Sequence, residues 1–283
     1  MSIFGRLFRS KPNASGAIFN RFLLGLVLVL TLAGQTLYAQ QSDTNVKKLA
    51  EIRAKAEKGD AEAQWELGKA FSNGEFGLEK DQQEAVKWYR KSAEQNFASA
   101  QVDLGFCYMF GKGVEQEQQE AVKWWRKAAE QNNVVAQTNL GACYCNGNGV
   151  AIDYMEAMKW YRKAAEQNYA PAQTIIGNCY YSGILVAKDD VEAVKWWRKA
   201  AEQNDAPAQA EMGESYFKGT GVAKDMAEAY KWFLLAIAQG EEGINGIIKK
   251  RVRHLEKKLE KDQIVAVKKQ VDEWVQQHKK ATN

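Results

Sequence analysis

The sequence predicts an all-α protein, a solenoid of antiparallel helix pairs with capping helices at its ends. Tryptophan recurs every 36 residues at Trp88, Trp124, Trp160, Trp196 and Trp232. Glycine recurs with the same period at Gly105, Gly141, Gly177 and Gly213. The tetrapeptide AEQN does so at 93–96, 129–132, 165–168 and 201–204. Periods of about 20–50 residues are typical of stacked helical repeats, in which each repeat buries its apolar face against its neighbours.

The period divides the chain into a central array and two flanking segments. We expect five repeats, at 61–96, 97–132, 133–168, 169–204 and 205–240. Residues 40–60 are expected to form a linker and an N-terminal capping helix. Residues 241–283 are expected to form C-terminal capping helices, two amphipathic segments at 244–259 and 262–278. Solenoid ends need such caps, because an open end exposes an apolar face.

Each repeat is predicted to contain two helices joined by a glycine turn. In the third repeat the first helix follows a polar boundary at Asn132 and ends at Gly147, since glycine readily takes the left-handed conformation that terminates helices. The second helix starts at Asp153 with Glu156 three residues later, which resembles a capping box. Aromatic and alanine residues at helical spacing, as in 121–128, indicate a packing stripe rather than a ligand-binding aromatic box.

The repeat pattern resembles the Sel1-like repeat, a relative of the tetratricopeptide repeat. In residues 133–168 the matching positions are Ala136, Gln137, Leu140, Gly141, Tyr144, Gly147, Gly149, Val150, Asp153, Glu156, Ala157, Lys159, Trp160 and Tyr161. The resemblance covers about 61–240. The fourth repeat departs from it at 183–186, where Gly-Ile-Leu-Val replaces Gly-x-Gly-Val. The resemblance implies a right-handed superhelix that acts as a protein-binding adaptor.

The N-terminal segment has the layout of an export signal. Residues 22–33 form a charge-free, mostly apolar run of twelve between a basic stretch and the polar residues 40–44. The run is shorter than the about 20 residues that a membrane-spanning helix needs. We therefore expect residues 1–39 to be a signal peptide. The alternative is that the segment stays uncleaved and anchors the protein to a membrane. In both cases the repeats are expected in the periplasm or outside the cell.

The charge balance points to a protein partner rather than a nucleic acid. Residues 1–39 contain four of the 39 Lys and Arg and no acid, so the remainder is balanced against the 35 Asp and Glu. Nucleic-acid binding usually needs a net basic surface. Residues 249–283 are basic, which we interpret as a solvated helix face, with a basic docking surface as the alternative. We expect a monomer that binds a protein.

An exported hydrolase of the β-lactamase type is the alternative function, because certain cysteine-rich relatives have been described as such enzymes. Ser215 and Lys218 have the required Ser-x-x-Lys spacing. However, Ser215 occupies a repeat position that holds Cys or Ala elsewhere, and no Ser-Asp-Asn or Lys-Thr-Gly motif accompanies it. The two histidines, His254 and His278, offer little for a triad or a zinc site. We predict no catalytic residue, cofactor or metal.

The cysteines follow the repeat. Three of the four occupy one repeat position: Cys107, Cys143 and Cys179. Packed helices lie about 8–10 Å apart, whereas a disulfide needs Cα atoms within about 7 Å. Ala70 and Ser215 fill the same position in other repeats, so the position requires a small residue and we expect buried free thiols. For one pair, Cys145 and Cys179, the sequence leaves open whether a disulfide forms.

Positions that vary between repeats while the fold stays constant are available for recognition. Each first helix has four such positions, and successive ones lie 4, 3 and 1 residues apart. This spacing places them on one helical face. In the second to fourth repeats they are residues 102, 106, 109 and 110; 138, 142, 145 and 146; and 174, 178, 181 and 182. We call this surface, with its equivalents in the outer repeats, the variable face. In tetratricopeptide-like superhelices it lines the concave groove.

Ten residues of the variable face are the candidate partner-binding residues: Trp65, Lys69, Val102, Phe106, Met109, Phe110, Asn178, Tyr181, Glu214 and Phe217. We expect the four from the second repeat to form an exposed apolar patch, since such patches anchor partners. Phe106, Phe110 and Tyr181 are the expected anchors for a peptide or helix. Contact with the neighbouring repeat is the alternative for some of the ten.

Overall fold

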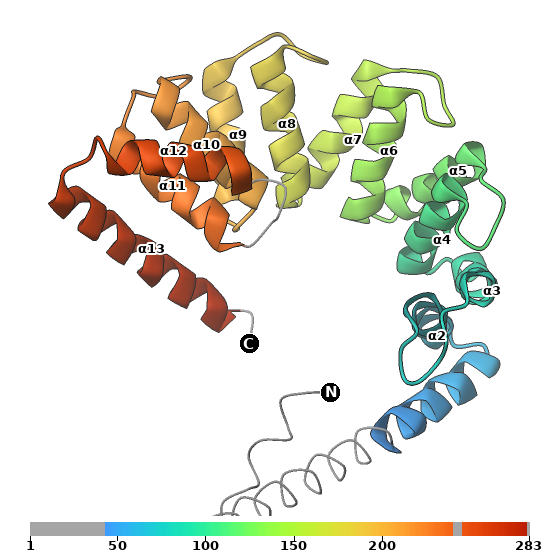
Figure 1. Ribbon diagram of the computed structural model, residues 1–283. Coiled ribbons are helices and arrows are strands. Elements are labelled where there is room, and N and C mark those ends of the chain that lie inside the picture. The colour runs from blue at the N-terminus through green and yellow to red at the C-terminus, as the bar shows by residue number, and fades with distance from the viewer. Residues whose placement is uncertain (1–42, 240–244, 282–283) are drawn as a thin grey trace, which may run out of the picture. The chain divides into compact units, whose positions relative to one another are not determined.

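The computed structural model describes residues 43–239 and 245–281, and every regular element in these ranges is an α-helix (Figure 1). The expected signal peptide at 1–39 lies outside the described residues. Of the helices described, none combines the length and apolarity that crossing a membrane requires. The chain divides into two compact units, residues 1–88 and 89–283, and each is described by itself.

The first unit contains the N-terminal capping helix and the start of the array. A helix over residues 43–57 precedes α2 (Ala61–Asn73), and α3 (Gln82–Glu94) begins in this unit and continues into the second. Ile52 and Ala56 of the capping helix pack against Ala63 and Leu67 of α2. This apolar contact covers the first face of the array, as a solenoid end requires.

The second unit is a run of helix pairs followed by two further helices. These are α4 (Ala98–Phe110), α5 (Gln118–Glu130), α6 (Val134–Asn146), α7 (Tyr154–Glu166), α8 (Ala170–Ser182), α9 (Asp190–Ala201), α10 (Ala206–Lys218), α11 (Met226–Ala238), α12 (Asn245–Glu256) and α13 (Lys261–Ala281). The two helices of each pair pack together, and α5, α7 and α9 also pack on the first helix of the following pair. The predicted all-α solenoid of helix pairs is confirmed.

Left-handed residues separate the helices. First helices end at the predicted glycines, such as Gly111 and Gly219, with φ of 65° and 79°. The asparagines that mark the polar boundary after each second helix, such as Asn132 and Asn168, are also left-handed, both with φ of 64°. Asparagine is one of the few residues besides glycine that adopts this conformation readily. The recurrent Asn therefore shapes the turn as well as marking it.

The second helices start at an aspartate that caps the backbone, except α5, where the predicted capping residue Glu117 makes no side-chain cap hydrogen bond. Asp153 accepts hydrogen bonds from the N–H groups of Met155 and Glu156, both at 3.0 Å. Asp189 and Asp225 cap their helices in the same way. The glutamate of the expected capping box has another partner, because Glu156 forms an ion pair with Lys159 at 3.1 Å. The aspartate thus supplies the capping that the sequence predicted.

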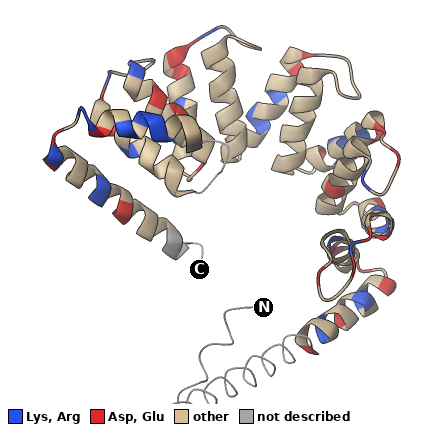
Figure 2. Ribbon diagram, viewed as in Figure 1, with Lys and Arg blue, Asp and Glu red and all other residues tan. Residues whose placement is uncertain are grey.

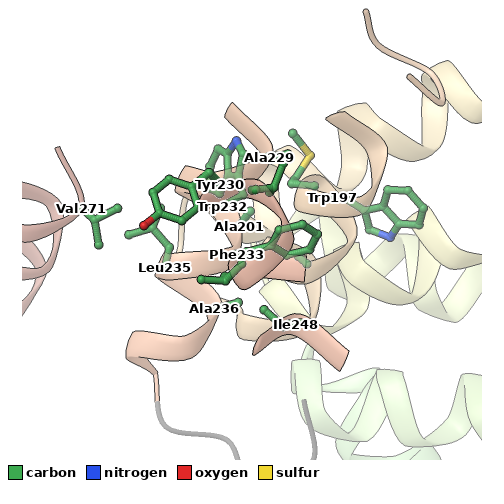
Figure 3. Packing of buried hydrophobic residues seen from close by; sticks show 14 of the residues in the cluster. Trp197, Ala201, Ala229, Tyr230, Trp232, Phe233, Leu235, Ala236, Ile248 and Val271 are labelled. Carbon is green, nitrogen blue, oxygen red and sulfur yellow. The ribbon is translucent and has the colours of Figure 1, made fainter. Parts of the chain in front are cut away.

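The helix pairs pack through aromatic side chains, and the last pair is covered by α12 and α13. Trp197, Tyr230 and Phe233 are fully buried in the cluster that Figure 3 shows. Ile248 of α12 and Val271 of α13 pack into the same cluster. The predicted C-terminal capping helices therefore close the array with apolar contacts to α11.

The departure of the fourth repeat from Gly-x-Gly-Val leaves its backbone unchanged. Leu185 takes a left-handed φ of 69°, close to the 72° and 70° of its equivalents Gly149 and Gly221. This conformation is costly for leucine. Leu185 packs against the buried cluster that contains Met158 and Ile176, which offsets the cost.

Candidate partner-binding face

Two phenylalanines of the second repeat stand on the variable face. The Phe110 side chain is 61% exposed, and its ring stacks on that of Phe106 with centroids 6.2 Å apart. The Phe106 ring in turn meets Trp125 of α5 edge-on at 5.3 Å. Trp125 is buried and its indole N–H donates to the Val102 carbonyl at 3.0 Å. A fixed tryptophan therefore holds both phenylalanine rings in place.

The exposed apolar patch expected in the second repeat is smaller than predicted. Val102 and Met109 are only 7% and 6% exposed, so Phe106 and Phe110 alone present apolar surface there. Val102 is buried where α5 crosses α4, as its bond from Trp125 shows. Met109 is buried as well, and its equivalent Cys145 packs on the cluster that contains Tyr161 of α7 and Cys179 of α8. In the second repeat, two of the four predicted residues are thus buried within the array.

The fourth repeat builds a similar arrangement with different side chains. The Oδ1 atom of Asn178 accepts a hydrogen bond from the Trp197 indole N–H at 2.9 Å. Tyr181, 38% exposed, lies against the same tryptophan with ring centroids 5.4 Å apart. The Lys188 ammonium is 5.4 Å from the centre of the Tyr181 ring. The buried aromatic residue of the second helix therefore supports the variable face in both repeats.

In the fifth repeat α12 covers the predicted binding residues. The Glu214 carboxylate pairs with Arg251 at 2.8 Å, and the Arg251 guanidinium lies 4.6 Å from the centre of the Phe217 ring. His254 meets Phe217 edge-on at 5.9 Å. Burial alone would raise the pKa of Glu214, but hydrogen bonds from Arg251 and Lys218 outweigh it and hold that pKa below its ordinary value. Glu214 and Phe217 therefore face this chain's own helix.

Two candidates lie in the first unit and are described apart from the rest. Trp65 and Lys69 are half-buried on α2. The Lys69 ammonium lies 4.5 Å from the centre of the Trp65 ring, a cation–π contact. These side chains therefore form a local pair on the first helix of the first repeat.

Two cavities of the second unit lie at the connecting loops, away from the variable face. One of about 610 Å³ is lined by Glu117–Gln119 together with Gly147 and Gly149–Ala151. The other, of about 460 Å³, runs along α9 from Val191 to Glu202 and is bordered by Gly221 and Val222. Both form where a glycine turn lies beside the second helix of the preceding repeat, so they follow from the repeat geometry.

The residues considered for hydrolysis are not arranged for it. Ser215 is 3% exposed, and Lys218 forms an ion pair with Glu214 at 3.0 Å. The serine hydroxyl is therefore out of reach of a substrate in solution, and the lysine ammonium is engaged with a carboxylate. Within the part of the chain that the structure describes, no group of three or more His, Cys, Asp and Glu is placed to hold a metal ion.

The four cysteines are free thiols. Cys107, Cys143 and Cys179 are buried, and burial raises the pKa of each thiol to about 11. Cys145 is half-buried beside the cluster that contains Cys179. The pair Cys145 and Cys179 is not bridged. The position that Cys107, Cys143 and Cys179 share is the small buried site that the repeat predicted.

Comparison with known proteins identifies the repeat. The family model of the Sel1 repeat matches residues 61–97, 98–133, 134–169, 170–205 and 206–241. These bounds lie up to one residue later than the repeat bounds expected from the sequence. No curated protein matches the chain.

Two solved structures are similar over most of the chain. One is a protective antigen of uropathogenic Escherichia coli strains that displays an SLR fold, with 39% identity and a TM-score of 0.64 over 69% of this chain. The other is a Sel1 repeat protein from Oxalobacter formigenes, with 32% identity and a TM-score of 0.65 over 72% of this chain. The matches span 42% and 59% of those two proteins.

Proposed function

The chain belongs to the Sel1 repeat family, and we propose that it is a non-enzymatic scaffold that binds a segment of another protein on the variable face. One observation carries this proposal. Phe110 is 61% exposed, although it is stacked on Phe106 and supported through it by Trp125. Large aromatic side chains that a partner can bury are typical of the few residues that dominate binding energy.

The rigidity of the aromatic pair favours binding. Burying a phenylalanine side chain contributes about 1.5–3 kcal/mol. Immobilising a flexible side chain at an interface costs about 0.5–1.5 kcal/mol. Phe106 is already fixed between Trp125 and Phe110. Binding a partner there therefore requires little further immobilisation of side chains.

We also propose that the repeats work outside the cytoplasm. The support is the apolar run at 22–33 with its basic and polar flanks. The intact mass of the protein purified from cells, together with its N-terminal sequence, tests this. A mature chain beginning near residue 40 in a periplasmic or secreted fraction is the expected result, and a full-length cytoplasmic chain would contradict it.

Binding is tested by capture of partners with matched variants. The double variant Phe106→Ser/Phe110→Ser removes the aromatic pair. Val265→Ser is the control, since Val265 is a 67% exposed apolar residue on α13, outside the variable face. We expect the wild type and the control to retain the same protein from envelope extracts, and the double variant to lose it while its helical circular dichroism is unchanged. Equal affinity of all three proteins for that partner would refute the proposal.

A further inference from the structure

The first helices of the middle repeats are almost free of charge. Helices α6 and α8 contain no Asp, Glu, Lys or Arg, and α4 contains only Asp103. In Figure 2 both α6 and α8 are tan along their whole length. The second helices carry the charges, as in the ion pairs Glu120–Lys123 and Glu156–Lys159. The variable face of α6 and α8 therefore has no charge of its own. The charges beside it are Asp205, whose Oδ1 atom accepts a hydrogen bond from Thr174 at 2.9 Å, and Lys188, whose ammonium lies 5.4 Å from the centre of the Tyr181 ring.

This neutrality is not a requirement of the repeat. The position of Phe106, Ala142 and Asn178 holds Lys69 in the first repeat and Glu214 in the fifth. The neighbouring position holds Glu66 and Glu211 in those repeats, Asp103 in the second repeat, and the uncharged Asn139 and Ile175 in the third and fourth. Helices α2 and α10 form with these charges in place. The fold accepts charge at both positions, so folding does not require α6 and α8 to be neutral.

A neutral surface selects against charged ligands. A carboxylate or ammonium that docks on α6 or α8 loses water, and these helices provide no opposite charge to compensate for it. The hydroxyl groups of Thr138 and Ser182 are engaged as well. Thr138 donates to the Val134 carbonyl at 2.8 Å and Ser182 to the Asn178 carbonyl at 2.7 Å. The variable face therefore offers apolar contacts and neutral polar atoms.

We infer that the variable face of α4, α6 and α8 binds an uncharged segment that places an aromatic or aliphatic side chain on Phe106 and Phe110. This inference rests on the proposed scaffold function and specifies the chemistry of the partner. Asp103 and Lys188 limit the neutral stretch on either side.

Selection of peptides tests the inference. Random dodecapeptides displayed on phage are selected on the full chain and eluted peptides are screened against Phe106→Ser/Phe110→Ser. We expect the peptides that depend on the aromatic pair to contain five or more consecutive uncharged residues with an aromatic or aliphatic residue among them. Enrichment of acidic or basic peptides on the same face would overturn the inference and leave the scaffold function standing. If no selected peptide depended on the aromatic pair, the scaffold proposal itself would fail.

Charge variants give a second measurement with the selected peptides. Ala142→Glu places on α6 the carboxylate that Glu214 has in the fifth repeat, and Asn146→Glu does so at an exposed position where folding is not at risk. We expect either variant to weaken binding of an uncharged peptide with blocked termini by tenfold or more, because docking would bury the new carboxylate without an opposite charge. Val265→Glu on α13 should leave it unchanged. Equal affinities for all four proteins would overturn the inference.

Discussion

Gly105 of α4 lies directly against the indole ring of Trp125 of α5: a methyl group at Gly105 would come within 2.4 Å of the Trp125 Nε1 atom. Gly177 and Trp197 repeat this relationship, also with 2.4 Å. Non-bonded atoms do not approach one another this closely. The second helix can therefore pack at this distance from the first only where the first has glycine. Close packing within each pair, rather than backbone freedom, therefore explains why glycine recurs inside the first helices.

Gly105→Ala should destabilise the protein. Added volume in a well-packed core costs about 1–3 kcal/mol, and Trp125 cannot move aside without losing its hydrogen bond to Val102. The intrinsic helix preference of alanine over glycine, about 1 kcal/mol, acts in the opposite direction. We expect a net loss of up to about 2 kcal/mol in the free energy of unfolding, measured by urea denaturation.

The same substitution at Gly246 is the matched control. Gly246 lies in α12, and a methyl group there would have no atom within 4 Å. Only the helix preference remains, so Gly246→Ala should leave stability unchanged or raise it by up to about 1 kcal/mol. If the two alanine variants shifted the urea midpoint in the same direction, the close-packing explanation would be wrong.

The periodic features of the fold are predictable because each is a local rule repeated five times. Gly147 ends a helix and Asp153 starts the next through contacts within a few residues, which a sequence pattern contains directly. Comparing repeats then separates positions that the fold fixes from those that vary. This reasoning predicted both the helix pairs and the shared position of the three buried cysteines.

The candidate site was predicted less well, because exposure depends on neighbours that the repeat pattern does not contain. Met109 varies between repeats, yet it is 6% exposed. Glu214 and Phe217 vary too, but α12 covers them through Arg251 and His254. Helix α12 lies outside the repeats, so no comparison between repeats could reveal this contact. The sequence contained one sign of this contact: Glu214 places a carboxylate at a repeat position that is uncharged in the middle repeats.

Stability should fall at alkaline pH because of the buried thiols. Burial raises the pKa of Cys107, Cys143 and Cys179 from an ordinary value of 9.0 to about 11. A group whose pKa is raised in the folded state contributes its full stability below the unfolded value and loses that contribution as pH rises through the folded value. The free energy of unfolding should therefore decrease between about pH 9 and pH 11, measured by urea denaturation at several pH values.

A triple variant isolates the contribution of the buried thiols. Cys107→Ala, Cys143→Ala and Cys179→Ala together introduce the residue that Ala70 supplies at this position in the first repeat. Its stability should vary less between pH 9 and pH 11 than that of the wild type. Parallel curves for the two proteins would show that the thiols do not contribute. Alkylation in denaturant without reductant should modify all four cysteines of the wild type.

Arg251→Met should loosen the C-terminal helices in a pH-dependent way. The substitution keeps an apolar side chain over Phe217 but removes the charge that pairs with Glu214. Because the pKa of Glu214 is lowered in the folded state, its contribution is present at neutral pH and is lost as pH falls through the folded value. We expect a loss of about 1 kcal/mol at pH 7, reduced for partial exposure, and a smaller loss near pH 3, measured by urea denaturation.

Lys268→Met is the control for that experiment. Lys268 pairs with Glu256 at 3.4 Å in the same C-terminal region, but its side chain is 54% exposed. Exposed ion pairs contribute about 0–1 kcal/mol, so this variant should change the urea midpoint less than Arg251→Met does at pH 7. If the loss for Arg251→Met were the same at both pH values, the ion pair with Glu214 would not be its cause.

The two asparagines Asn132 and Asn168 should respond differently to glycine, although both have a φ of 64°. Glycine adopts this conformation without steric cost, so the substitution tests the side chain alone. The Asn168 Oδ1 atom accepts hydrogen bonds from Gln173 at 3.1 Å and Gln203 at 3.2 Å. Among the described residues, the Asn132 side chain has no such bond.

Asn168→Gly should therefore cost about 1 kcal/mol in the free energy of unfolding, the usual contribution of a hydrogen bond. Asn132→Gly should stay within about 0.5 kcal/mol of the wild type. Asn132→Ala supplies the third comparison, because it keeps a side chain while removing the residue suited to a left-handed φ, at a cost of about 1–2 kcal/mol. Urea denaturation of the three variants separates the two roles. Equal losses for the two glycine variants would mean that the asparagine amide does not link neighbouring repeats, and that its conformation alone accounts for its recurrence.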